Sequence, residues 1–232
     1  MTINKIILQP AFVLHARSYR DTSLLVELLT KHYGRLTVVA RGARSMKSRL
    51  RGTLVPFLPL LVTFSGKTDL KTLQQSETCG TSYALKNETL LSGFYLNELL
   101  IKLLPYHEAY PSIYDAYQDT LDIIVKSQEL EIALRLFEKC LLANLGYGLR
   151  LDRTNSNELI LAGEQYSFEF GYGFYKAKTE HTYNFPGKSL LALHCGNFTD
   201  KKEIQDAKRL LRSIIAILLG NKNLKSRELF KI

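Results

Sequence analysis

The chain has 232 residues, of which 46% are hydrophobic and 23% are charged, and its formal net charge is +9. This length and composition fit a globular protein of one large or two small domains and exclude a disordered chain. No apolar run approaches the roughly 20 residues of a membrane span, and the apolar part of MTINKIILQPAF is too short for a secretory signal, so we expect a cytoplasmic protein without membrane contact.

The first 80 residues have the pattern of short strands separated by turns. Runs rich in Val, Leu, Thr and Phe alternate with the turn-forming stretches SYRD, KHYG and SGKTD. Five strands are predicted: Ala11–Ser18, Thr22–Thr30, Arg35–Arg41, Pro59–Ser65 and Leu70–Thr78. Five short strands at this spacing predict an OB-fold, a small barrel that binds oligonucleotides, as a domain over residues 1–80.

After residue 80 the spacing of apolar residues becomes helical. Four helices are predicted, over Thr89–Pro105, from Pro111 to Lys126, from Glu129 to Gly146, and from Thr199 to Gly220. Between the third and the fourth, YSFEFGYGFYKA predicts a hairpin with a Gly-Tyr-Gly turn. We therefore expect an α+β protein, with a mainly helical domain over residues 81–232 that carries a small β-hairpin insertion at about 150–188.

Positive charge is concentrated in one stretch of the predicted barrel. RGARSMKSRLRG, from Arg41 to Gly52, holds five basic side chains and no acidic one, and falls between the third and fourth strands. Residues 1–80 carry 12 Lys and Arg against 4 Asp and Glu, whereas residues 81–232 carry 19 against 18. The stretch could be a solvated loop or a membrane-binding segment, but its strand-like neighbours and its clustered charge favour contact with nucleic acid.

Motifs for catalysis are absent from the sequence. It contains no GxxxxGK[ST], HExxH or GxSxG motif and no dinucleotide-binding glycine fingerprint. The histidines are dispersed, and Cys79, Cys140 and Cys195 form no CxxC pair, so we expect reduced, mostly buried thiols and neither a disulfide framework nor a metal site. The sequence predicts a binding protein that is not an enzyme and needs no cofactor.

A succession of short motifs resembles one protein family over nearly the whole chain. These motifs are FVLHAR, TSLL, GRLTVVARGARS, PFLPLLVTFSG, KTL, GFYLNELL, LGYG and LKSRELF, in this order from about residue 10 to the C-terminus. Each motif alone is weak, but their order is similar to that of the RecO family of recombination mediator proteins.

The resemblance implies a role in DNA repair, which composition and charge alone do not indicate. RecO-like proteins bind single- and double-stranded DNA, anneal complementary strands and contact the C-terminal tail of single-stranded DNA-binding protein. They act with RecR to load RecA in the RecF pathway of DNA repair and recombination. The resemblance therefore implies these partners, RecA indirectly, and a nucleoid-associated location in the cytoplasm.

Arginine and lysine side chains are the predicted DNA contacts, because guanidinium groups hold phosphate oxygens without reading sequence. The phosphate-contacting residues are expected to be Arg35, Arg41, Arg44, Lys47, Arg49 and Arg51. Tyr33 and Phe64 are candidates for base stacking, although Phe64 lies within a strand and suits the core. Lys225 and Arg227 either extend the DNA surface or merely end the fold.

One arginine of the helical domain is a candidate receptor for an acidic-hydrophobic peptide tail. Arg135 falls outside the apolar stripe of its predicted helix, and Leu142 follows two turns later on the same side. The alternative is a solvated arginine paired with Glu131 or Glu138.

The sequence departs from the RecO pattern after LGYG, where many members hold four cysteines that bind zinc. No cysteine occurs between Leu149 and Tyr175, so zinc is not expected and the hairpin would rest on packing of its aromatic residues. Two other functions remain open: a general RNA-binding or nucleic-acid chaperone protein on the same barrel, and a nuclease that uses scattered acidic residues.

Overall fold

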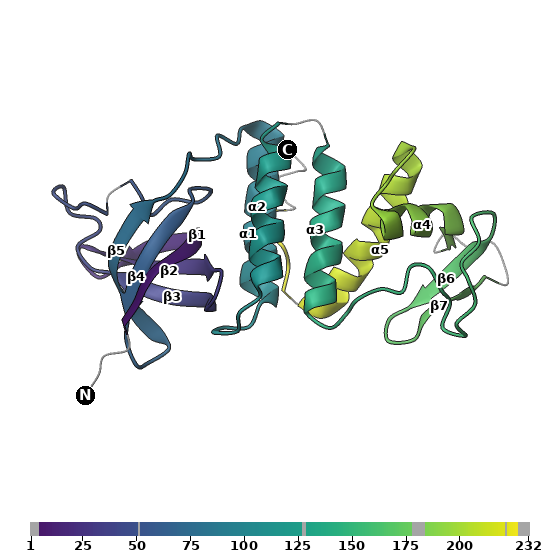
Figure 1. Ribbon diagram of the computed structural model, residues 1–232, viewed down its shortest axis with the longest axis horizontal. Helices are drawn as coiled ribbons and strands as arrows, with labels where there is room; N and C mark the ends of the chain where they lie inside the picture. Colours follow the sequence, from purple (N-terminus) through teal and green to yellow (C-terminus); the bar gives the residue numbers. More distant parts are fainter. Residues whose placement is uncertain (1–4, 51, 127–128, 178–183, 221, 227–232) are drawn as a thin grey trace. The chain divides into compact units, whose positions relative to one another are not determined.

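A computed structural model describes residues 5–50, 52–126, 129–177, 184–220 and 222–226 (Figure 1). The chain forms two compact units. The first contains the barrel, two helices and the segment 223–226, and the second contains the remaining helices and a small sheet. Among the described residues, no helix is both long and apolar enough to span a membrane.

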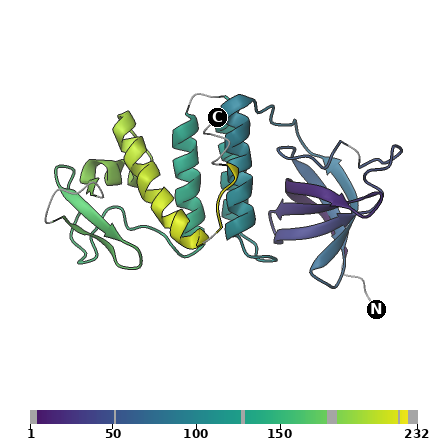
Figure 2. The same ribbon diagram turned by 180° about the vertical axis from the view of Figure 1, so that it is seen from behind.

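Five strands close into a barrel in the first unit (Figures 1 and 2). They are β1 (Lys5–Tyr19), β2 (Ser23–Thr30), β3 (Gly34–Ala40), β4 (Leu60–Ser65) and β5 (Leu70–Thr78). Their order is β1-β2-β3-β5-β4, with β4 returning to β1, and only the β3–β5 pair is parallel. A closed five-stranded barrel with this order is the OB-fold arrangement, as the strand pattern predicts.

The first strand is longer than the sequence pattern indicates. The prediction began at Ala11, whereas β1 begins at Lys5 and pairs first with β4 and then with β2. Ala11 is the residue at which the strand changes partner, since it pairs with both Thr30 and Leu60. Pro10 lies next to Ala11. A proline usually interrupts a central strand, but it is tolerated where the pairing of a strand changes.

Alternate strand residues fill the interior of the barrel. Val26, Val38, Leu60 and Val62 are fully buried, and Phe64 is 1% exposed. This alternation is the pattern of a barrel whose outward residues contact solvent or other elements. The buried residues fix the register of the strands and therefore the positions of the loops between them.

Two helices complete the first unit: α1 (Asn87–Leu103) and α2 (Pro111–Ile124). Pro111 occupies the first turn of α2, as predicted. A buried polar network joins them to the barrel, because the Asn97 side-chain amide donates to the Leu14 carbonyl at 3.0 Å and the Tyr117 hydroxyl donates to the Asn97 side-chain oxygen at 2.6 Å.

The second unit combines three helices with a three-stranded sheet. Its elements are α3 (Leu130–Asn144), β6 (Gln165–Glu169), β7 (Gly173–Lys176), β8 (Phe185–Pro186), α4 (Gly187–Cys195) and α5 (Lys201–Leu219). The predicted hairpin is β6–β7, to which β8 adds a third strand in the order β7-β6-β8. The sequence pattern missed α4, a nine-residue helix that follows Pro186 and is too short to display a helical period.

Capping interactions mark the ends of two helices. Asp200 caps α5 and accepts a hydrogen bond from the Glu203 backbone N–H at 2.9 Å, while the Glu203 carboxylate accepts from the Asp200 backbone N–H. Gly146, just after α3, has a φ of +85°, the left-handed conformation that ends helices. The α+β class, with an N-terminal five-stranded barrel and a helical C-terminal region, is therefore as predicted.

The network around Asn97 predicts a measurable loss of stability. Asn97→Leu leaves the buried Leu14 carbonyl without its amide donor and should lower the free energy of unfolding by about 1–3 kcal/mol. Tyr117→Phe keeps that amide bond and should cost less. Urea unfolding of the full chain measures both, and equal losses in the two variants would contradict this role of Asn97.

Candidate nucleic-acid interface

The connection between β3 and β4 carries an exposed group of cations. Arg41, Arg44, Lys47 and Arg49 are all exposed, and no ion pair joins them to another described residue. Arg51 belongs to the same stretch but lies outside the described residues. We call these four described cations the basic loop.

Apolar residues of the same connection hold the basic loop on the barrel. Ala43, Leu54 and Leu58 are buried in the barrel core, and Leu50 packs against it. The Arg44 backbone N–H donates to the Thr22 carbonyl at 2.9 Å, which fixes the beginning of the loop against the β1–β2 turn. The sequence thus alternates anchoring apolar residues with charged residues that face solvent.

Two further arginines lie at the same end of the barrel. The Arg44 guanidinium approaches the Arg20 carbonyl at 3.4 Å, so Arg20 is next to the loop. Arg17 pairs with Leu25 and Leu25 with Val39, which places Arg17 two strands away from the beginning of the loop. Sequence reasoning missed both because they are isolated cations and not part of a charge run. Both are exposed.

Arg35 differs from the prediction that it contacts phosphate. Its side chain is 8% exposed, its Nε donates to the Leu104 carbonyl at 3.1 Å, and its guanidinium carbon lies 3.7 Å from the centre of the Tyr106 ring. An ion pair of 3.5 Å joins it to Glu27. The preceding residue, Gly34, lets the Glu108 backbone lie close to the start of β3, since a Cβ there would meet the Glu108 carbonyl oxygen at 1.9 Å. Arg35 is therefore not part of the exposed surface.

The two aromatic candidates lie at the other end of β3. Phe64 is 1% exposed and belongs to the core, so its face is not open to a base. Tyr33 is 40% exposed, and its ring meets Phe64 edge-on with centroids 5.8 Å apart. The seven residues of β3, about 20 Å of strand, separate Tyr33 from Arg41. The structure does not bring Tyr33 together with the basic loop.

The C-terminal segment of the first unit is tied to α1. The backbone N–H groups of Lys225 and Ser226 each donate to the Glu98 carboxylate at 2.9 Å. Lys225 keeps an exposed side chain, whereas Arg227 lies outside the described residues. Burial alone would raise the pKa of Glu98, but the hydrogen bonds from Ser226, Lys225 and Lys102 hold it below the ordinary value of 4.5.

The predicted peptide receptor on α3 is not exposed. Arg135 is 4% exposed and its Nη2 lies 2.7 Å from a carboxylate oxygen of Glu138, while Leu142 is 1% exposed. The ion pair with Glu138 is one of the two pairings expected for a solvated Arg135, but both partners are buried and the arginine is not solvated. The spacing of apolar residues in α3 did not indicate that polar residues outside the apolar stripe are buried as well. Neither Arg135 nor Leu142 presents a surface for a peptide.

No group of three or more His, Cys, Asp or Glu side chains suited to a metal ion occurs among the described residues. All three cysteines are free thiols. Cys79 and Cys195 are exposed and Cys140 is half-buried, in contrast to the expectation of mostly buried thiols. Both exposed cysteines lie at the ends of elements, Cys79 just after β5 and Cys195 at the end of α4, where burial is incomplete.

The enclosure of Arg35 predicts a structural role. Arg35→Met keeps much of the apolar stem but removes the charge, so Glu27 and the Leu104 carbonyl lose their partner. The free energy of unfolding should fall by about 1.5–3 kcal/mol. Arg41→Met, at an exposed position without an ion pair, is the matched control and should change stability by less than about 0.5 kcal/mol. Equal effects in urea unfolding would contradict the assignment.

The lowered pKa of Glu98 predicts a pH-dependent loss of stability. A carboxyl whose pKa is lower in the folded state stabilises the fold above its ordinary pKa and loses this contribution as pH falls through the folded value. The difference in unfolding free energy between the natural chain and Glu98→Gln should therefore shrink between about pH 6 and about pH 3. A difference that stays constant over this range would show that the Glu98 contacts add no such stability.

Comparison with known proteins assigns the family. Residues 2–82 match the family described as Recombination protein O N terminal, and residues 87–228 match Recombination protein O C terminal. The chain is 46% identical over 227 residues to the DNA repair protein RecO of Coxiella burnetii, which covers 97% of this chain and 98% of that protein. It is 44% identical to that of Cellvibrio japonicus, with 96% of each chain covered, and 42% identical to that of Methylococcus capsulatus, with 98% and 94% covered. The chain belongs to the RecO family of DNA repair proteins, recombination mediators that are not enzymes.

Proposed function

We propose that the chain binds DNA through the basic loop and anneals complementary single strands during recombinational repair. The observation that carries the proposal is the set of four exposed cations without ion pairs at one end of an OB-fold barrel. Arg17 and Arg20 extend the same positive surface. Six cations at one end of a small barrel would raise the local potential and attract phosphate groups.

The chemistry of the basic loop favours contact with the DNA backbone. Guanidinium groups form paired hydrogen bonds with phosphate oxygens, whereas sequence reading needs side chains that reach base edges in a fixed geometry. The stretch from Arg41 to Leu50 holds no Asn, Gln, Asp or Glu, the side chains that pair with adenine and cytosine edges. Binding should therefore tolerate any sequence and weaken with salt.

Annealing follows from the same charges. Two complementary strands repel each other through their phosphates, and a cationic surface that neutralises both lowers this repulsion without ATP. The proposed activity accordingly needs binding and release but no chemical step.

Family membership supports the remaining partners. We propose that the protein works in the cytoplasm with RecR, contacts the C-terminal tail of single-stranded DNA-binding protein and thereby helps RecA to load on DNA. The burial of Arg135 and Leu142 gives no support to a tail site at those residues, so we assign no residues to that contact. Lys225 remains a candidate for an additional DNA contact because its side chain is accessible. Tyr33 is accessible too, but its position at the other end of β3 from the basic loop gives no support to a contact there.

Charge reversal of the basic loop tests the proposed function. Replacing Arg41, Arg44, Lys47 and Arg49 by Glu should weaken single-strand binding and slow annealing at low salt. Each lost contact should make the log-log salt dependence shallower by about 0.7, so the total change should approach about 3. Fluorescence anisotropy of a labelled oligonucleotide across a salt series measures both the affinity and the slope.

The matched control reverses four exposed cations of α5 instead, namely Lys201, Lys202, Lys208 and Arg212. The two variants have the same net charge, so only the place of the charges differs. Equal losses in both variants, or wild-type affinity in the loop variant, would refute the loop assignment. Tighter binding to RNA than to DNA of equal length would favour the alternative of a general RNA-binding protein.

A further inference from the structure

The second unit contains an aromatic cavity that the proposed function does not use. It has a volume of about 420 Å³ and lies between the segment after α3 and the turn of the β6–β7 hairpin. Tyr147 contributes from the segment after α3, Phe170 and Tyr172 from the hairpin turn, and Ile214 from α5. All these residues belong to the same unit.

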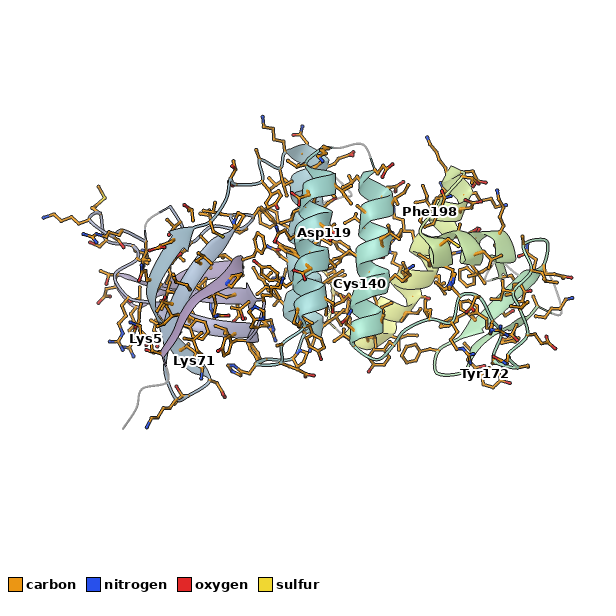
Figure 3. The ribbon with its side chains drawn as sticks, in the orientation of Figure 1. Lys5, Lys71, Asp119, Cys140, Tyr172 and Phe198 are labelled. Carbon is orange, nitrogen blue, oxygen red and sulfur yellow. The ribbon has the colours of Figure 1, made fainter. Side chains whose placement is uncertain are left out.

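Three rings at this cavity are exposed to solvent. Tyr147 and Phe170 stack with their centroids 5.9 Å apart and their planes 29° from parallel, yet they remain 44% and 37% exposed. Tyr172 is 60% exposed and is labelled on the hairpin in Figure 3. Exposed aromatic residues that gather in one place mark interaction sites more often than single exposed ones do.

The rings are positioned by packing and by backbone turns. Phe174 is 2% exposed and packs against Phe168 with centroids 4.9 Å apart, which gives the cavity a fixed floor. The Tyr147 N–H donates to the Leu142 carbonyl at 2.8 Å, and the Tyr172 N–H donates to the Glu169 carbonyl at 3.1 Å. The open faces are therefore held in place before any ligand binds, which lowers the entropic cost of binding.

The charged side chains that line the cavity are two arginines. Arg150 donates to the Asn157 side-chain oxygen at 2.9 Å, and Arg153 donates to the Asn157 carbonyl at 3.0 Å. The described lining contains no acidic residue, although Asp152 lies 3.8 Å from Arg153 outside it. Flat aromatic faces next to guanidinium groups suit a ligand that combines planar rings with negative charge.

We propose that this cavity binds the bases of a single-stranded nucleic acid. One or two bases would stack on the exposed faces of Tyr147, Phe170 and Tyr172, and the adjoining phosphates would lie near Arg150 and Arg153. Stacking tolerates every base, since each base has a π-face, and it requires that the strand be unpaired. A paired duplex, whose bases are already stacked, would not bind here.

The inference rests on the proposed function and extends it. The basic loop and the aromatic cavity belong to different compact units, so the protein has two separate contacts of different chemistry. The loop would hold phosphates of single or double strands, whereas the cavity would select unpaired bases. A strand held at the cavity with its neighbouring bases free is suited to search for its complement.

A tryptophan reporter tests the site directly, because the chain contains no tryptophan. Tyr172→Trp places a single fluorophore at the cavity, and a stacked base should quench it. A thymidine oligonucleotide should quench the fluorescence and bind roughly five-fold or more tightly than an abasic strand of equal length and charge. Leu161→Trp, an exposed position of the same unit outside the cavity, is the matched control and should show no quenching.

Substitutions of the stacked pair make the test specific. In the Tyr172→Trp chain, replacement of both Tyr147 and Phe170 by Leu should abolish the preference for the base-bearing strand. Tyr147→Phe keeps the ring and should retain that preference. Equal quenching by base-bearing and abasic strands, or no quenching by either, would overturn the proposal.

The same assay separates this inference from the proposed function. It is repeated with the four cations of the basic loop replaced by Glu. Base-dependent quenching that persists in this chain supports the cavity site, whether or not the loop substitutions weaken DNA binding. Loss of affinity on loop reversal without any base-dependent quenching in either chain would leave the loop assignment standing and refute the cavity alone.

Discussion

The enclosed Arg35 guanidinium joins the barrel to the segment between the two helices of the first unit. Tyr106 covers one face of this group, Glu27 balances its charge, and the Leu104 carbonyl accepts its Nε–H. The His107 N–H also donates to the Arg35 carbonyl at 2.9 Å. These contacts join the start of β3 to the connection between α1 and α2. A buried charge without such partners would destabilise the fold, so these contacts hold β3 and the segment after α1 together.

This arrangement gives β3 two different ends. Its N-terminal end is closed by the Arg35 contacts and by the close approach of Gly34 to the Glu108 backbone. Its C-terminal end runs into the basic loop, whose cations contact no acidic side chain among the described residues. The two ends use the same residue type differently: an enclosed arginine stabilises the fold, whereas exposed ones remain available to a polyanion.

Much of the fold could be predicted from the sequence, because alternation and helical spacing are local. The predicted bounds of β5, Leu70–Thr78, are those of the structure, and the predicted start of the last helix, Thr199, lies one residue before the Asp200 cap. The role of Arg35 was not predictable, since its partners Leu104 and Tyr106 lie about 70 residues away along the chain. The stacking of Tyr147 on Phe170 was not predictable either, because these two residues are also distant along the chain. Charge runs show where cations are frequent, but only tertiary contacts show which of them are already engaged.

The exposed cations, which form no ion pair with another described residue, favour DNA held at the basic loop and not at the closed end of the barrel. Hydrogen–deuterium exchange of the full chain, with and without a single-stranded oligonucleotide, tests this most directly. We expect slower exchange of the amides between Gly42 and Leu50 on binding, with little change in the β2–β3 turn around Tyr33. Protection of that turn without protection of the loop would contradict it.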